Sequence, residues 1–363
     1  MKPQTLTASL SSGLMLASVW MGMVVLTGCN HDNTPTAITV PTTPVPVAHI
    51  FGSSEAGLVN GTAAQARFSN PVNVEIASDG TVYVADYDND AIRQISPSGQ
   101  VTTLIKQNNF NRPFGLSLSN DEKQLFIQTD GNDTGQRDAT TGTIWRLNLT
   151  VGAVPAVVVR NSGRPRGLLV LPDDRIALSD MAHHVISILN PTTGVVTPLA
   201  GQKDVPGFDN GTGSSAHFDR PYGLALATDG ALLVADQTNN SIRKVTLSGL
   251  VTTYAGLGPT HAGKVDGSLG SATFNGPQDL AINGTKLYVV DHNNHTIRLI
   301  NNSTVSTIIG NGSAGFVDAQ GTTASFFGVE GFALTRDGKN LWLADGNNGD
   351  GDPYNRVRRL TTP

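Results

Sequence analysis

Five polar side chains break an otherwise apolar or glycine pattern at two neighbouring positions that recur along this chain of 363 residues. The first position follows a repeated proline in most copies, and the second position is the next residue. Arg166, Gln278 and Glu330 occupy the first position, and Asn73 and Asp279 occupy the second. Carboxylate, amide and guanidinium groups that converge in one place can orient a small polar ligand.

These residues suggest two kinds of chemistry. If the copies form a ring, Arg166 and Glu330 converge across its channel and bind a ligand there. Alternatively, Glu330, Asp279 and Asn73 supply oxygen ligands to a divalent metal, Ca or Zn, with Gln278 as a fourth ligand. Three other copies carry residues that supply no further oxygen ligand at the first position: Val72, Phe114 and Tyr222. We therefore expect no cofactor and keep the metal as the alternative interpretation.

Four histidines follow the second strand of two copies, where loops at one face are expected: His183, His184, His292 and His295. Channel-mouth histidines can bind zinc or act as bases. The chain contains neither a His-x-x-x-His nor a Cys-x-x-Cys spacing that would support such a role. We therefore predict solvated loop histidines.

A repeated pattern must position all of these residues. Its clearest copy runs from Val-Ala-Asp at 234–236 through Ile-Arg-Lys-Val at 242–245 to Val-Thr-Thr at 251–253, and close variants begin at 84 and 289. Short apolar runs of strand length alternate with Gly, Asn, Asp and Ser clusters that reverse the chain. Each copy therefore predicts four antiparallel strands, and four strands at a fixed period are typical of a propeller blade.

Two recurring residues mark the copies. A proline or Val329 precedes the first position in six copies: Pro71, Pro113, Pro165, Pro221, Pro277 and Val329. An aspartate ends the second strand in the same six: Asp86, Asp130, Asp180, Asp236, Asp291 and Asp345. The sixth copy lacks its last strand, and residues 47–52 have the shape of the missing one. The sequence thus predicts an all-β, six-bladed β-propeller of four-stranded antiparallel blades over residues 46–363, with the N-terminal strand closing the ring.

Residues that recur in most copies are expected to serve the blade. The six aspartates should accept hydrogen bonds from backbone amides of the following turn. The arginines of the third strand should lie between blades: Arg93, Arg243, Arg298 and Arg358.

The repeats resemble NHL repeats, and residues 46–363 resemble a six-bladed NHL-type propeller. In the related gluconolactonase-like enzymes, acidic and amide side chains hold a divalent metal at the channel, and the Glu-Gly-Phe at 330–332 is similar to one of those ligand positions. This second resemblance implies a metal-dependent lactonase-like hydrolase or a lyase with its site at the channel mouth.

The N-terminal residues have the pattern of a targeting sequence. Residues 1–29 combine one lysine, an apolar stretch and Leu-Thr-Gly-Cys, which is typical of a secretory signal. This ending resembles the lipobox of bacterial lipoproteins, and it implies that Cys29, the single cysteine, carries a lipid. Residues 30–45 are rich in proline and threonine and predict an extended tether. The resemblance implies a cell-envelope protein, attached to the outer membrane in a Gram-negative cell.

The charge pattern limits the classes of partner that the protein is expected to bind. The net charge is −5, and lysine and arginine are scattered along the repeats. Nucleic acid is therefore not an expected partner. We predict a monomeric, lipid-anchored binding module for a protein, peptide or glycan, with the metal-dependent enzyme as the alternative.

Overall fold

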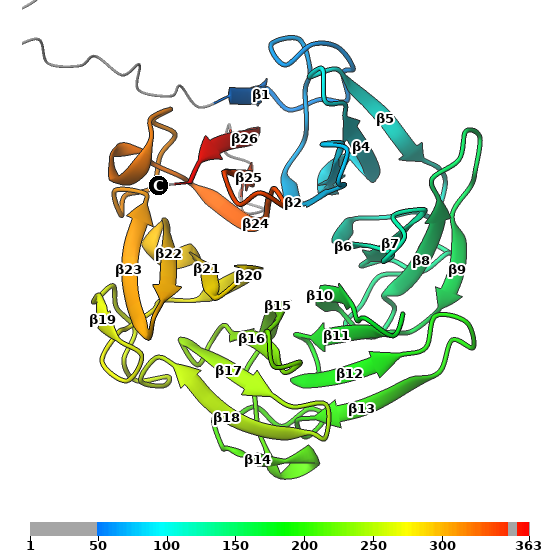
Figure 1. Ribbon diagram of the computed structural model, residues 1–363. Helices are drawn as coiled ribbons and strands as arrows, with labels where there is room; N and C mark the ends of the chain where they lie inside the picture. Colours follow the sequence, from blue (N-terminus) through cyan, green and yellow to red (C-terminus); the bar gives the residue numbers. More distant parts are fainter. Residues whose placement is uncertain (1–48, 348–353, 363) are drawn as a thin grey trace, which may run out of the picture. The chain divides into compact units, whose positions relative to one another are not determined.

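The computed structural model describes residues 49–347 and 354–362, which form six antiparallel sheets arranged in a ring around a central axis (Figure 1). Each sheet is one blade, as the sequence predicts. The innermost strands contact their neighbours in a closed ring, from β2 through β6, β10, β15, β20 and β24 back to β2. Among these residues, no helix is long and apolar enough to cross a membrane.

Strands of the same rank have similar bounds in every blade. The inner strands are β2 (Pro71–Ile76), β6 (Pro113–Leu118), β10 (Pro165–Val170), β15 (Pro221–Leu226), β20 (Pro277–Asn283) and β24 (Gly328–Leu334). The second strands are β3 (Val82–Asp86), β7 (Gln124–Thr129), β11 (Ile176–Asp180), β16 (Leu232–Asp236), β21 (Lys286–Asp291) and β25 (Asn340–Gly346). The third strands are β4 (Ala91–Ile95), β8 (Thr143–Asn148), β12 (Val185–Leu189), β17 (Ser241–Val245), β22 (Thr296–Asn301) and β26 (Asn355–Thr361).

The outer strands are β5 (Val101–Lys106), β9 (Ala156–Val159), β13 (Val196–Ala200), β18 (Leu250–Ala255), β23 (Thr304–Ile309) and β1 (His49–Ser53). The strand β1 pairs with β26, so the N-terminal strand completes the last blade and the prediction of ring closure is confirmed. The fourth and fifth blades carry one further two-residue strand on this edge, β14 (Gly211–Thr212) and β19 (Gly267–Ser268). Four short 3-10 turns complete the described elements: Tyr87–Asn89, Gly213–Ser215, His292–Asn294 and Gly321–Thr323.

Buried ion pairs join four blades to the loops that precede them. Arg243, for example, is 0 % exposed and donates to Asp236 Oδ2 at 2.8 Å and to Asn210 Oδ1 at 2.8 Å. Its guanidinium also lies over the ring of Phe218, which is buried beneath it. The same arrangement recurs at Arg93, Arg298 and Arg358. These arginines therefore connect a blade to the loop that precedes it, whereas the prediction placed them between blades.

The role predicted for the aspartates is confirmed at Asp180, whose Oδ1 accepts the backbone N–H of Ala182 in the following turn at 3.0 Å, and needs a correction elsewhere. Asp236 Oδ1 accepts the backbone N–H of Asp219, which precedes the inner strand, instead of an amide of the following turn. Asp86 and Asp291 accept the corresponding amides of Ser69 and Asn275. The reason is that the end of the second strand lies beside the start of the inner strand, as the pairing of Pro221 with Asp236 shows.

Candidate functional site

A cavity of about 390 Å³ lies at the start of the inner strands, and we call it the mouth cavity. All six residues of the first position line it: Val72, Phe114, Arg166, Tyr222, Gln278 and Glu330. In every blade the strand register shifts at this position, as between Pro71 and Asn73. Such a bulge leaves one residue unpaired and re-aims its side chain. The fold therefore presents Arg166, Gln278 and Glu330 to one space, as predicted.

The second position faces elsewhere. Asn73 and Asp279 line another cavity of about 330 Å³ further along the inner strands, which we call the far cavity. Glycine holds this position in the sixth blade because a Cβ on Gly331 would lie 2.7 Å from the backbone oxygen of Val72. The sequence analysis placed both positions at the mouth, but the strand geometry separates them.

The alternative metal ligands are consequently split between two cavities. Glu330 lines the mouth cavity, whereas Asp279 and Asn73 line the far cavity. Asp279 accepts the backbone N–H groups of Leu280 and Phe332, and Asn73 Oδ1 accepts that of Val74. Among the described residues, no group of three or more His, Cys, Asp or Glu side chains is arranged to hold a metal ion.

Sequence reasoning missed Glu75, the second carboxylate of the far cavity. Glu75 Oε1 accepts the backbone N–H of Leu118 at 3.1 Å. Burial raises the pKa of Glu75 to about 7, and the nearby charge of Asp279 adds to the increase. Burial likewise raises the pKa of Asp279 to about 7. The period-2 alternation of β2 places Glu75 on the same side as Asn73, and that signal was available in the sequence.

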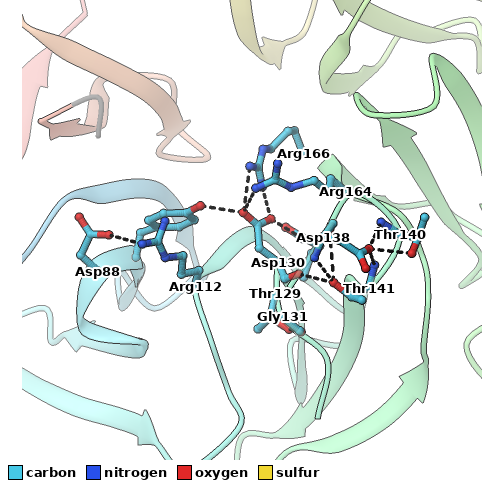
Figure 2. Close-up of polar contacts among 12 residues, drawn as sticks. Asp88, Arg112, Thr129, Asp130, Gly131, Asp138, Thr140, Thr141, Arg164 and Arg166 are labelled. Carbon is cyan, nitrogen blue, oxygen red and sulfur yellow. Dashed lines mark hydrogen bonds and ion pairs between the residues drawn. The ribbon is translucent and has the colours of Figure 1, made fainter. Parts of the chain in front are cut away.

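Arg166 forms its ion pair with Asp130 and not with Glu330 (Figure 2). Its guanidinium donates to both carboxylate oxygens, at 2.6 and 3.2 Å, and Arg164 donates to Oδ2 at 2.7 Å. The Tyr87 hydroxyl donates to the same oxygen at 2.7 Å. Burial alone would raise the pKa of Asp130, but the charges and hydrogen bonds of the two arginines outweigh it and hold this pKa well below its usual range.

Asp130 reaches Arg166 because it lies one residue beyond the position assigned to it. Pro113 pairs with Thr129, just as Pro71 pairs with Asp86. Thr129 therefore occupies the structural position, where its hydroxyl accepts the Trp145 indole N–H at 2.8 Å in place of an arginine. A shift of one residue turns a side chain to the other face.

Glu330 and Gln278 form the other side of the mouth cavity. The Tyr222 hydroxyl donates to Glu330 Oε2 at 3.1 Å. Burial raises the pKa of Glu330 to about 7, although Arg166 and this hydrogen bond act against the increase. Gln278 is 5 % exposed, and its Oε1 has no hydrogen-bond partner among the described residues.

The prediction of solvated loop histidines is wrong for two of the four. His183 is buried and its Nδ1 lies 2.6 Å from Asp180 Oδ2. His292 is also buried and lines the mouth cavity, with Nδ1 2.9 Å from the backbone oxygen of Val329. Burial lowers the pKa of His292, so its neutral form is favoured. His292 thus faces the mouth cavity, whereas the His183 ring is held by Asp180.

Comparison with known proteins places the chain among propellers. The family model described as Teneurin NHL domain matches residues 52–323. NHL repeat-containing protein 2 of Gallus gallus is 24% identical over 327 residues, which cover 83% of this chain and 41% of that protein. Protein SUPPRESSOR OF QUENCHING 1 of Arabidopsis thaliana is 27% identical over 290 residues, covering 70% of this chain and 27% of that protein. The chain thus spans less than half the length of these relatives.

Solved structures share the fold at low sequence identity. An auxiliary nutrient binding protein from Bacteroides thetaiotaomicron has a TM-score of 0.67 at 15% identity, covering 86% of this chain and 76% of that one. Virginiamycin B lyase from Staphylococcus aureus has a TM-score of 0.55 at 15% identity, covering 87% of this chain and 99% of that one. At such identities the likeness concerns the propeller architecture.

Proposed function

The chain belongs to the Teneurin NHL domain family, and we propose that it is a binding module whose ligand site is the mouth cavity. The ligand is a protein, peptide or glycan segment that enters this space. The observation that carries the proposal is Gln278, a nearly buried amide that lines the cavity with an unsatisfied acceptor oxygen. Leaving such a group unpaired costs about 1–3 kcal/mol, which a ligand that donates a hydrogen bond would recover.

The surrounding side chains are fixed before any ligand arrives. Arg166 is held by Asp130, and Glu330 is held by Tyr222. The rings of Phe114 and Tyr222 pack edge to face at 5.7 Å. Pre-arranged groups lose little conformational entropy on binding, so this cavity suits recognition.

A binding role also agrees with the fold neighbours, since two of them from Bacteroides are described as auxiliary nutrient binding proteins. We further propose that the propeller acts at the cell envelope, tethered by a lipid on Cys29 and most simply at the outer membrane of a Gram-negative cell. The segments behind this part of the proposal, residues 1–29 and 30–45, lie outside the described residues.

We favour binding over the metal-dependent lactonase-like hydrolase or lyase because Glu330, Asp279 and Asn73 border two different cavities. Elemental analysis of the full-length chain, purified without chelator or nickel, tests that alternative. One zinc or calcium per chain that is lost in Glu330→Gln would favour the enzyme.

The binding site itself is tested with a panel of saccharides and short peptides. Ligands that raise the unfolding temperature of the full-length chain are then titrated into a Gln278→Leu, Glu330→Gln double variant. We expect the response to disappear in this variant and to persist in Arg336→Gln, whose arginine lies beyond the far end of β24. If no ligand responds, or if every response survives the double variant, the mouth cavity is not the binding site.

A further inference from the structure

We propose that the mouth cavity recognises a sugar that carries a carboxylate, such as a uronic acid residue of a glycan. This inference rests on the proposed binding function and names the chemical class of its ligand. It follows from an uneven distribution of charge around the cavity.

One half of the mouth is cationic. Three arginines from consecutive blades, Arg112, Arg166 and Arg220, line the cavity, and Glu330 is the one carboxylate among its lining residues. Arg166 is already paired with Asp130, which lies beneath it. The other two arginines therefore give this side of the cavity an excess of positive charge.

Arg220 is the guanidinium that remains available. Its side chain is exposed, and it forms no ion pair with any described residue. Arg112 lies 4.0 Å from Asp88 and over the ring of Tyr87, so nearby groups already stabilise its charge (Figure 2). A guanidinium binds a carboxylate through two parallel hydrogen bonds, which favours a planar anion at this place.

The backbone gives no reason for arginine at these two positions. Arg112 and Arg220 have φ of 55° and 57°, and the equivalent residues of the first and fifth blades are Asn70 and Gly276. Asparagine and glycine are the residues that adopt this left-handed conformation most readily. The arginines therefore occupy a conformation that the fold fills with better-suited residues elsewhere, which indicates a role for their charge.

The other half of the mouth carries Gln278 and Glu330, whose oxygens accept hydrogen bonds. Gln278 Oε1 needs a donor, and a ligand hydroxyl is the simplest group that supplies one. The rings of Phe114 and Tyr222 also line the cavity, and the Arg166 guanidinium lies over the Phe114 ring at 4.0 Å. A cavity of about 390 Å³ is of the size that accommodates small polar ligands.

Glu330 decides between anions of different charge. Its carboxylate shares the cavity with the arginines and would repel a phosphate dianion more strongly than a singly charged carboxylate. The combination of one planar anion and several hydroxyl groups is the chemistry of a uronic acid.

The test titrates D-glucuronate, trigalacturonate and D-glucose into the full-length chain by calorimetry at low ionic strength. We expect both acidic sugars to bind more tightly than glucose. Arg220→Gln should weaken the acidic sugars by about 10-fold or more, because a hydrogen bond to a charged group is lost. Arg336→Gln, which removes an arginine beyond the opposite end of the inner strand, should leave the affinities unchanged. Gln278→Leu should weaken all three sugars.

Three outcomes would overturn the inference. Equal binding of glucose and glucuronate, unaffected by Arg220→Gln but weakened by Gln278→Leu, would keep the mouth as the binding site and remove its preference for a carboxylate. Glucose 6-phosphate is titrated in the same way, and its tighter binding than that of glucuronate would replace the carboxylate by a phosphate. If none of these sugars binds, a sugar is excluded as the ligand. The short peptides of the panel described under the proposed function would still test whether the mouth cavity is a binding site.

Discussion

Replacing Asp130 by asparagine removes a buried charge while keeping the shape of the side chain, and it should change the mouth cavity in two measurable ways. The carboxylate binds Arg166 at 2.6 Å and Arg164 at 2.7 Å, and Asp130 is 0 % exposed. Removing one partner of a buried ion pair costs about 3–5 kcal/mol because the other charge stays behind. Arg164 is one-quarter exposed and can be hydrated, so we expect the free energy of unfolding to fall by about 3 kcal/mol.

The second effect concerns Glu330, whose pKa depends on both partners. The charge of Arg166 lowers this pKa and the charge of Asp130 raises it, against a dominant increase from burial that brings it to about 7. In Asp130→Asn, the negative charge that raises the pKa of Glu330 is removed, and the positive charge of Arg166 is no longer neutralised. A unit charge acting over about 10 Å at an effective dielectric constant of about 20 contributes about 1.7 kcal/mol, or roughly one pH unit. We therefore expect the pKa of Glu330 to fall by about one pH unit, toward its ordinary value.

The composition makes this measurement practical. The chain contains four glutamates, Glu55, Glu75, Glu122 and Glu330. Glutamate labelled with ¹³C at the side-chain carboxyl therefore gives four signals, and Glu330→Gln identifies the relevant one by its disappearance. Titration of the labelled chain between pH 4 and 9 gives the pKa before and after the substitution.

Asp236→Asn is the matched control, because it also removes a fully buried aspartate that pairs with an arginine. It should destabilise the fold by a similar amount and leave the Glu330 titration where it was, since Asp236 pairs with Arg243 and, unlike Asp130, is not among the charges that shift the pKa of Glu330. If Asp130→Asn leaves the pKa of Glu330 within about 0.3 pH units of its original value, the electrostatic coupling between these groups does not exist. A fall of similar size in Asp236→Asn would show that general destabilisation, and not the mouth network, moves the titration.

Three further predictions concern stability. Gln278→Leu should leave the free energy of unfolding in urea unchanged or raise it by up to about 1 kcal/mol, because it removes an unpaired buried acceptor; a loss above about 2 kcal/mol would mean that the amide is satisfied. Glu75 and Asp279 have a folded-state pKa of about 7, above the ordinary 4.5 and 3.8, so the fold favours their protonated forms. Glu330, with a pKa of about 7, contributes in the same way. The contribution is complete below about pH 4 and is lost as the pH rises through 7, so the free energy of unfolding should fall by about 1–3 kcal/mol between pH 5.5 and 8.5, and Asp279→Asn should reduce this fall by about one third. Deleting His49–Ser53 removes the pairing partner of β26, and amide exchange in β26 should accelerate by about 100-fold or more relative to β17; equal rates would show that β1 does not support the blade.

The fold was predictable because the same pattern of strands and turns occurs six times in the chain. Every copy carries apolar runs of strand length, turn clusters and the buried arginine or its substitute, so errors in one copy are corrected by the others. The N-terminal strand could be assigned to the last blade because the sixth copy ends one strand short and residues 49–53 match the missing strand. The strand pattern of each copy and the closure of the whole ring therefore predicted the same fold.

The candidate site was predictable only in part. Arg166, Gln278 and Glu330 meet in one cavity because the bulge at the first position is a property of every blade. Asn73 and Asp279 are one residue further along, and a single step in a strand moves a side chain to different surroundings. The sequence contains both positions but does not show where the bulge ends, and that is why one set was placed correctly and the other was not.

In the second blade, comparison of residue types alone assigned the wrong role to Asp130. Thr129 and Asp130 are adjacent. The other five copies carry an aspartate at the end of the second strand, so comparison of residue types gives Asp130 that structural position. The third strand contradicts this, because Trp145 stands where Arg93 and Arg243 stand in their blades. An indole N–H pairs with a hydroxyl and cannot neutralise a buried carboxylate, so the partner of Trp145 had to be Thr129. The freed aspartate anchors Arg166 instead. Arg220 then lines the mouth cavity without an ion pair to any described residue, which is the arrangement expected of a site that receives its remaining anion from a ligand.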